Sequence, residues 1–193
     1  MIRMETHAAI RHLRRTPSPV RSRRTHLIRA MRNVHAHLLI IGEGPLDDRL
    51  VAVALECGAT ANVTFLGNIE DIAPYYHAAD IFVLPSVARS EAFGIVQLEA
   101  MACGKPVVNT ALASGVPFVS VDGITGITVP PADSDALAVA LNLLLENAEL
   151  RARFGKAGEQ PVESGFNLPE MARRTFDLYQ ETFQNLPKPD TSR

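Results

Sequence analysis

The chain has 193 residues, of which 47% are hydrophobic and 21% are charged, and both fractions are typical of a globular domain. This composition excludes collagen-like, coiled-coil and wholly disordered proteins, and the length predicts a single domain. The longest apolar runs are far shorter than the roughly 18 residues that span a membrane, and no apolar signal segment follows the basic N-terminus. Two cysteines are too few for a disulfide framework, so we expect a cytoplasmic protein.

The net charge of −2 conceals an uneven distribution along the chain. Residues 1–33 contain nine arginines and one glutamate, a charge of +8, so residues 34–193 carry −10. Residues 1–24 have no aromatic side chain to stack on bases, and Pro17 and Pro19 interrupt any helix. We therefore predict a disordered basic leader at 1–24, a folded domain at 25–186 and a disordered tail at 187–193, with no nucleic acid bound and at most peripheral membrane association.

From residue 27 onward, apolar segments alternate regularly with turn residues. The pattern predicts a short helix at 27–32, a buried strand at 36–41 and a helix at 46–57 that ends at Gly58. A strand at 62–66, a helix at 69–79 and a strand at 81–84 follow.

The second half of the chain continues the pattern and then becomes helical. We predict a helix at 94–103 closed by Gly104, a strand at 106–109, and helices that begin near residues 134, 149 and 167. Strands of nearly continuous apolar residues alternating with helices predict an α/β fold, a doubly wound parallel sheet covered on both faces. The loops after its strands share one edge, where such sheets bind ligands.

The segment SEAFGIVQLEAMACGKPVV at residues 90–108 places two carboxylates at this edge. Glu91 and Glu99 are separated by seven residues, the first in a loop and the second inside the predicted helix. Helical side chains lean toward the N-terminus, so Glu99 can reach back to the crevice that Glu91 borders.

The start of the same helix is suited to binding an anion. The backbone amides of Phe93, Gly94, Ile95 and Val96 would present unpaired N–H groups and the positive end of the helix dipole. Gly94 lacks a Cβ, so a diphosphate could approach its backbone closely. An anion at the helix start, with a diol on each carboxylate, describes a nucleoside diphosphate sugar.

This segment, preceded by ADIFVLPS at 79–86, resembles the C-terminal donor-binding domain of retaining glycosyltransferases of family 4, which have the GT-B architecture with Rossmann-like halves. The likeness extends from about Leu27 to Glu181 and includes LLIIGEGPL at 38–46, VTFLG at 63–67 and DGITGITVPP at 122–131. The E-x7-E spacing alone is weak evidence, whereas this spaced series of motifs is specific.

The resemblance implies transfer of a hexose such as mannose from a UDP- or GDP-sugar, with retention of configuration, in polysaccharide biosynthesis. It makes Glu91 the catalytic-site residue that meets the sugar hydroxyls and Glu99 the residue that binds the ribose, while the amides of residues 93–96 meet the sugar and the diphosphate. Further donor-binding residues would be Gly42, Gly44, Leu66, Gly67 and Ile69. No cofactor or metal ion is expected, because protein dipoles and basic side chains stabilise the departing diphosphate in this family.

The sequence also departs from the family pattern. Members of the family have a separate N-terminal acceptor domain, to which nothing in this chain corresponds. Their donor domain also begins with a strand that carries an Arg and a Lys-Gly, which bind the diphosphate, and in this chain the leader occupies that position. The glutamate that follows the Gly-Val-Pro turn in the family is Phe118. These departures favour a truncated or frame-disrupted gene. One alternative function is therefore a non-catalytic remnant that binds nucleotide sugar weakly or not at all; another is binding of nucleic acid or an anionic surface through the leader. A working donor domain would instead need a separate acceptor-domain chain as its partner.

Three other motifs have simpler explanations. Gly42-Glu43-Gly44 lacks the third glycine of a dinucleotide-binding loop, where Asp47 stands. The metal-binding D-x-D pattern at residues 133–135 precedes a helix directly, which predicts an N-cap at Asp133. Cys103 lies among small residues at a helix end, which predicts a packed side chain rather than a nucleophile.

Overall fold

The computed structural model describes residues 7–10, 23–44 and 47–184. Within these residues, six strands form one parallel sheet in the order β3-β2-β1-β4-β5-β6. The strands are β1 (His7–Ile10), β2 (His37–Ile41), β3 (Val63–Leu66), β4 (Ile81–Val83), β5 (Val107–Thr110) and β6 (Gly126–Val129). The chain winds outward from β1 in both directions, which confirms the predicted doubly wound sheet.

Strand β1 corrects the predicted disordered leader. Ala8 pairs with Leu38 of β2 on one side and with Ile81 of β4 on the other, so β1 lies in the middle of the sheet. The prediction for residues 1–24 is therefore wrong at His7–Ile10, and also at the start of α1 (Arg23–Ala30). A four-residue strand is too short to show a hydrophobic period, and the partners that stabilise it are distant in the sequence. The other leader residues, 1–6 and 11–22, and the predicted tail at 187–193 lie outside the described residues.

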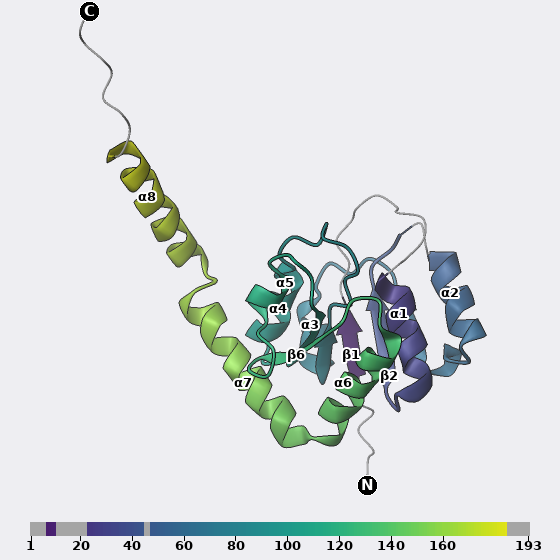
Figure 1. The fold of residues 1–193 in the computed structure, drawn as a ribbon. Helices are drawn as coiled ribbons and strands as arrows, with labels where there is room; N and C mark the ends of the chain where they lie inside the picture. Colours follow the sequence, from purple (N-terminus) through teal and green to yellow (C-terminus); the bar gives the residue numbers. More distant parts are fainter. Residues whose placement is uncertain (1–6, 11–22, 45–46, 185–193) are drawn as a thin grey trace, which may run out of the picture.

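Two groups of helices cover the two faces of the sheet (Figure 1). On one face, α1, α2 (Asp47–Glu56) and α6 (Ser134–Glu146) pack against alternate strand residues, and on the other α3 (Ala73–Ala78), α4 (Ile95–Ala102) and α5 (Val116–Val119) do so. Strand β4 shows the alternation: Ile81 and Val83 belong to the first core, and Phe82 to the second.

The remaining elements are η1 (Met31–Asn33), η2 (Thr60–Asn62), α7 (Ala148–Ser164) and α8 (Leu168–Gln184). The predicted N-cap at Asp133 is confirmed, and the helix predicted to begin near residue 167 is capped by Asn167. The Asp133 carboxylate accepts hydrogen bonds from the amides of Asp135 and Ala136 at 3.1 and 2.9 Å, and the Asn167 side chain accepts from the Glu170 amide at 2.8 Å. The D-x-D pattern at 133–135 therefore serves to start α6.

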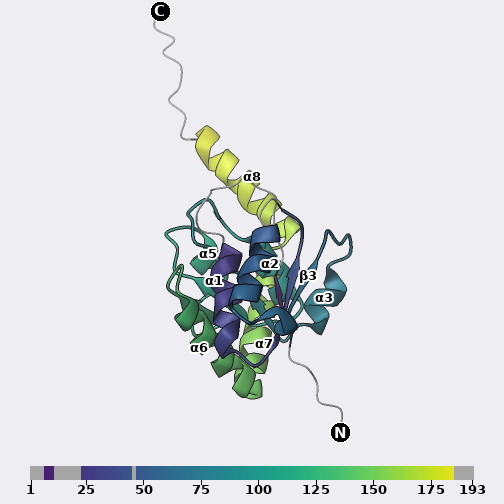
Figure 2. The ribbon, with the colours of Figure 1, turned by 90° about the vertical axis from the view of Figure 1, so that its right-hand side faces the viewer.

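Helix α8 projects away from the sheet in both views (Figures 1 and 2). Its large apolar side chains are exposed, namely Leu168, Met171, Phe176, Leu178, Tyr179 and Phe183. Among the described residues, no helix combines the length and apolarity needed to cross a membrane.

Candidate functional site

The order of the strands reverses between β1 and β4, and the elements that follow these strands bring two opposite charges together. Glu91 lies in the loop between β4 and α4, and Arg23 is the first residue of α1. The Arg23 guanidinium donates a hydrogen bond to Glu91 Oε2, and both side chains are largely buried, with exposed fractions of 21% and 16%. Sequence reasoning missed Arg23 because it was assigned to the leader. The structure therefore adds a cation to the predicted site.

The loops after β2 and β3 form a second part of the same edge. The Gly42 amide, at φ +107°, donates to the carbonyls of Leu66 and Gly67 at 2.9 and 3.1 Å. The Glu43 carboxylate lies over Gly67, where a Cβ would be only 2.9 Å from its Oε1, and it accepts from Asn68 Nδ2 at 3.0 Å. The structure thus brings three of the predicted donor-binding residues together.

The other two predicted donor-binding residues of these loops are Gly44 and Ile69, which are close in sequence to Gly42 and Gly67. The Gly44 amide donates to the Asp47 side chain at 2.9 Å, which ties the β2 loop to the start of α2. Ile69 is half-buried in the loop after β3. Both residues thus lie in the loops after β2 and β3, and their contact with a donor stays a prediction.

Two arginines begin α1 and face different loops of the site. Arg24 is buried and lies 3.6 Å from Asp47 Oδ1, at the start of α2, while Arg23 contacts Glu91. Burial, followed by the charge of Arg23, lowers the pKa of Arg24 below its usual range, although a guanidinium stays charged at neutral pH. The start of α1 therefore carries positive charge to the carboxyl edge of the sheet.

Helix α4 begins at this edge with a glycine. Gly94 is the N-cap, in the left-handed region at φ +74° and ψ +56°, and it has no side chain with which to cap the amides of Ile95 and Val96. The positive end of the α4 dipole therefore opens beside Glu91 and Phe93. A Cβ at position 94 would point into the core, 2.7 Å from Leu84 Cδ2, so the structure requires glycine for packing as well as for its backbone conformation.

The substitution Gly94→Ala is expected to cost about 2 to 4 kcal/mol of unfolding free energy, because it adds left-handed strain to overpacking against Leu84 and Gln97. Urea denaturation measures this cost. Gly58→Ala is the matched control, since Gly58 has φ +67° but no atom within 4 Å of an added Cβ. Equal costs for the two variants would contradict the packing part of this explanation.

A buried polar network fixes α4 on the sheet. Asn109 of β5 and Gln97 of α4 are 1% and 0% exposed. Asn109 Nδ2 donates to Gln97 Oε1 at 2.9 Å and to the Ser120 carbonyl at 3.1 Å, and Thr128 Oγ1 donates to Asn109 Oδ1 at 2.7 Å. Sequence reasoning did not identify this network, although a polar residue inside the apolar strand β5 was a usable signal.

The same network holds two loops of the site. Gln97 Nε2 donates to the carbonyls of Phe93 and Val116 at 3.3 and 3.2 Å. The Gly115 amide donates to the Ala92 carbonyl at 2.7 Å. The loop that carries Glu91 is thereby tied both to α4 and to the start of α5.

Glu99 lies in the second turn of α4 and is held by a tyrosine that the sequence analysis did not select. The hydroxyl of Tyr76, on α3, donates to Glu99 Oε2 at 2.9 Å, and it lies 3.4 Å from the carbonyl of Val96, one turn back. The Tyr76 hydroxyl therefore links the Glu99 carboxylate to the first turn of α4.

Two other features lie apart from this chemistry. Burial raises the pKa of the Cys103 thiol, which keeps it protonated at neutral pH and supports its prediction as a packed side chain. Within the described parts of the chain, no three His, Cys, Asp or Glu side chains gather as a metal site.

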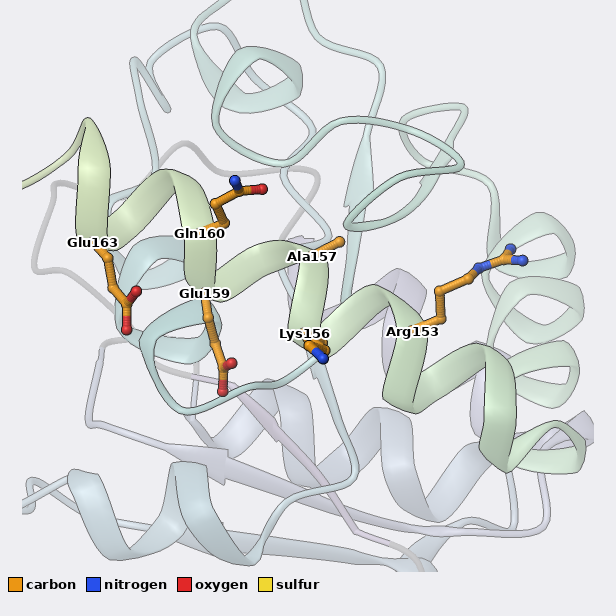
Figure 3. Close-up of a pocket in the computed structure, with 6 residues that line it drawn as sticks. All are labelled: Arg153, Lys156, Ala157, Glu159, Gln160 and Glu163. Atoms are coloured by element: carbon orange, nitrogen blue, oxygen red, sulfur yellow. The ribbon is translucent and has the colours of Figure 1, made fainter.

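A hollow of about 550 Å³ is lined by α7. Figure 3 shows the six lining residues, all on this helix, namely Arg153, Lys156, Ala157, Glu159, Gln160 and Glu163. Helix α7 packs closely on Gly104, in the turn between α4 and β5. None of the residues that line the hollow belongs to the candidate site.

Known proteins with similar sequences are glycosyltransferases. The chain is 33% identical over 144 residues to the O-antigen chain mannosyltransferase C of Escherichia coli, a match that covers 74% of this chain and 38% of the relative. It is 37% identical over 166 residues to the GDP-mannose-dependent monoacylated alpha-(1-6)-phosphatidylinositol monomannoside mannosyltransferase of Corynebacterium glutamicum, covering 80% of this chain and 42% of that protein. The chain thus spans about two fifths of the length of these curated relatives.

A solved structure agrees in fold. The sucrose-phosphate synthase of Thermosynechococcus elongatus superimposes with a TM-score of 0.79 at 32% identity, over 93% of this chain and 46% of that one. The fold is that of one half of a GT-B glycosyltransferase, as the resemblance implied. The sequence profile of the glycosyl transferases group 1 matches residues 23–160, so the chain belongs to the glycosyl transferases group 1 family.

Proposed function

We propose that this domain binds the nucleotide-sugar donor, a UDP- or GDP-hexose, in a sugar transfer that retains the anomeric configuration. The observation that carries the proposal is the open N-terminus of α4 at the carboxyl edge of the sheet, with Glu91 just before it and Glu99 in its second turn. The 37% identical relative that is named GDP-mannose-dependent supports a nucleotide sugar as the ligand.

The diphosphate would lie at the start of α4. The amides of Gly94, Ile95 and Val96 and the helix dipole favour an anion there, and Phe93 borders the same place. Arg23 adds a positive charge to this edge. When the bond between the anomeric carbon and the phosphate oxygen breaks, these groups would stabilise the nucleoside diphosphate that leaves, so we propose that no metal ion is needed.

The two carboxylates would orient the rest of the donor. A carboxylate accepts several hydrogen bonds, which suits it to a vicinal diol. We assign the hexose hydroxyls to Glu91 and the ribose to Glu99, and we place the base beside the joined loops of Gly42, Gly44, Leu66, Gly67 and Ile69. The ion pair with Arg23 would hold the Glu91 carboxylate in place.

Transfer to an acceptor is also part of the proposal. The oxygen of the acceptor hydroxyl would form the new glycosidic bond on the face that the diphosphate leaves, and the departing diphosphate would take up the proton of that hydroxyl. Because the chain covers 38% and 42% of the relatives named above, we assign acceptor binding to a separate segment or chain, in the cytoplasm.

Calorimetric titration of the purified chain tests the donor site. UDP-glucose, GDP-mannose, UDP and GDP are titrated in the presence of EDTA into the wild type, Glu99→Ala and Glu163→Ala. Glu163 is the matched control, an exposed helical glutamate of α7. We expect one nucleotide family to bind, and Glu99→Ala to weaken it by about 10- to 100-fold, since hydrogen bonds to a charged group are lost. Glu163→Ala should bind like the wild type. No binding by a chain shown to be folded would contradict the proposal.

A further inference from the structure

The hydrogen bond between Tyr76 and Glu99 has no role in the donor site proposed above. Tyr76 is 3% exposed, and its hydroxyl donates to Glu99 Oε2 at 2.9 Å. The second acceptor within reach, the Val96 carbonyl, is farther away at 3.4 Å. A phenol has one proton to donate, so the shorter, charge-assisted bond to the carboxylate is the stronger one.

The core fixes the position of this hydroxyl. The Tyr76 ring packs edge to face on Phe82 of β4, with centroids 5.7 Å apart and planes at 61°, and it belongs to the same buried cluster as Val96, Ala100 and Met101 of α4. The ring therefore joins α3, β4 and α4, and its polar end is aimed by apolar contacts. The packing of the ring thus holds the hydroxyl in one position.

Glu99, by contrast, is half-buried and has a long side chain with several rotatable bonds. Such a carboxylate would lose rotamer freedom on binding a ligand, which weakens affinity unless a neighbour already restricts it. The hydrogen bond from Tyr76 to Glu99 Oε2 restricts the rotamers of the side chain. The remaining lone pairs of the carboxylate can still accept hydrogen bonds from a diol.

We propose that Tyr76 is a positioning residue, which holds the Glu99 carboxylate in the orientation that the ribose diol of the donor requires. The inference rests on the proposed function, because it needs Glu99 to contact the ribose. It adds a residue from α3 to a site otherwise built from the loops, from α4 and from the start of α1.

Nucleotides that lack the diol separate this role from a purely structural one. The full chain is titrated with UDP and GDP and with their 2′,3′-dideoxy forms, as wild type, Tyr76→Phe, Glu99→Ala and the double variant. Tyr76→Phe keeps the ring on Phe82 and removes only the hydroxyl. Tyr75→Phe is the matched control, since it makes the same change at the neighbouring, half-buried position of α3. Thermal melts verify that each variant is folded.

We expect Tyr76→Phe to weaken binding of the ribonucleotide by about five- to tenfold and to leave the dideoxy form within about twofold of the wild type. Tyr75→Phe should change neither. In the Glu99→Ala background, Tyr76→Phe should have no further effect, because the two residues act as a unit.

Two results would overturn the role of Tyr76 while the donor site stands: equal weakening of both nucleotide forms, or additive effects of the two substitutions. A folded wild-type chain that binds neither UDP nor GDP would instead overturn the proposed function itself, and the role of Tyr76 with it.

Discussion

Gly126→Ala is expected to cost more than about 4 kcal/mol of unfolding free energy, enough to remove most of the stability of an ordinary domain. A Cβ at this position would lie 1.8 Å from the carbonyl oxygen of Val107 and 2.7 Å from its carbonyl carbon. Both atoms belong to the backbone of β5, which pairs with β6 in register from Val107 to Thr110. No rotamer change can relieve the clash, so the two strands would have to separate.

The measurement is chemical denaturation followed by circular dichroism. We expect the variant to lack a cooperative transition, or to show one near zero denaturant. Gly123→Ala is the matched control three residues earlier, because Gly123 has φ +71° and no atom within 4 Å of an added Cβ. Its cost should be about 1 to 2 kcal/mol, the left-handed strain alone. Similar transitions for the two variants would show that β5 and β6 do not approach as closely as the structure describes.

The comparison of Gly126 with Gly94 shows which parts of the fold were accessible from sequence. Gly94, Gly104 and Gly58 stand at helix ends, where glycine has a local meaning, and these boundaries were predicted correctly. Gly126 has to be glycine because β5, which comes from another part of the chain, lies too close to it for a Cβ. Its strand β6 and the short helix α5 were not predicted, since neither has a period of its own to recognise.

Strand β1 illustrates the same limit more sharply. His7–Ile10 stands among arginines and has only four residues, so local composition predicts disorder. What makes it a strand is its place between β2 and β4, the two longest-range pairings of the sheet. With β1 in place, the reversal of strand order beside Glu91 follows, and the candidate site gains its position in the fold.

The candidate site divides in a similar way. Glu91, Gly94 and Glu99 were predictable because one continuous motif contains them. Arg23 and Tyr76 contact these carboxylates from α1 and α3, and such partners depend on packing between helices that are distant in the sequence. Phe118, which stands where the family has a glutamate, is 70% exposed. Its ring packs edge to face on that of Phe166, with the ring centroids 6.1 Å apart.

Asn109→Leu is expected to be the second most damaging substitution, at a cost of about 3 to 5 kcal/mol, although the leucine side chain has the same branched shape as that of asparagine and is apolar, as a buried strand favours. It removes the donor to Gln97 Oε1 and to the Ser120 carbonyl, and the acceptor for Thr128 Oγ1. Each buried group left without a partner contributes roughly 1 to 3 kcal/mol of desolvation cost. Urea denaturation measures the total.

Two further variants show where the cost of Asn109→Leu comes from. Asn62→Leu makes the same change at an exposed position of η2 and should stay within about 0.5 kcal/mol of the wild type. Thr128→Val removes one bond of the network and should cost about 1 kcal/mol. If Asn109→Leu costs no more than Thr128→Val, the network does not act as a connected unit.

The network also predicts a functional effect under conditions where Asn109→Leu remains folded. Gln97 would lose the partner that orients its side chain, and its bonds to the Phe93 and Val116 carbonyls would loosen. The start of α4 would then be less ordered, and ordering it on ligand binding would reduce affinity for the nucleoside diphosphate. We expect binding to weaken about tenfold at low temperature, for ribo- and dideoxy forms alike. This uniform loss contrasts with the diol-dependent loss expected for Tyr76→Phe. Asn109 supports the start of α4, where we propose that the diphosphate binds, whereas Tyr76 holds Glu99.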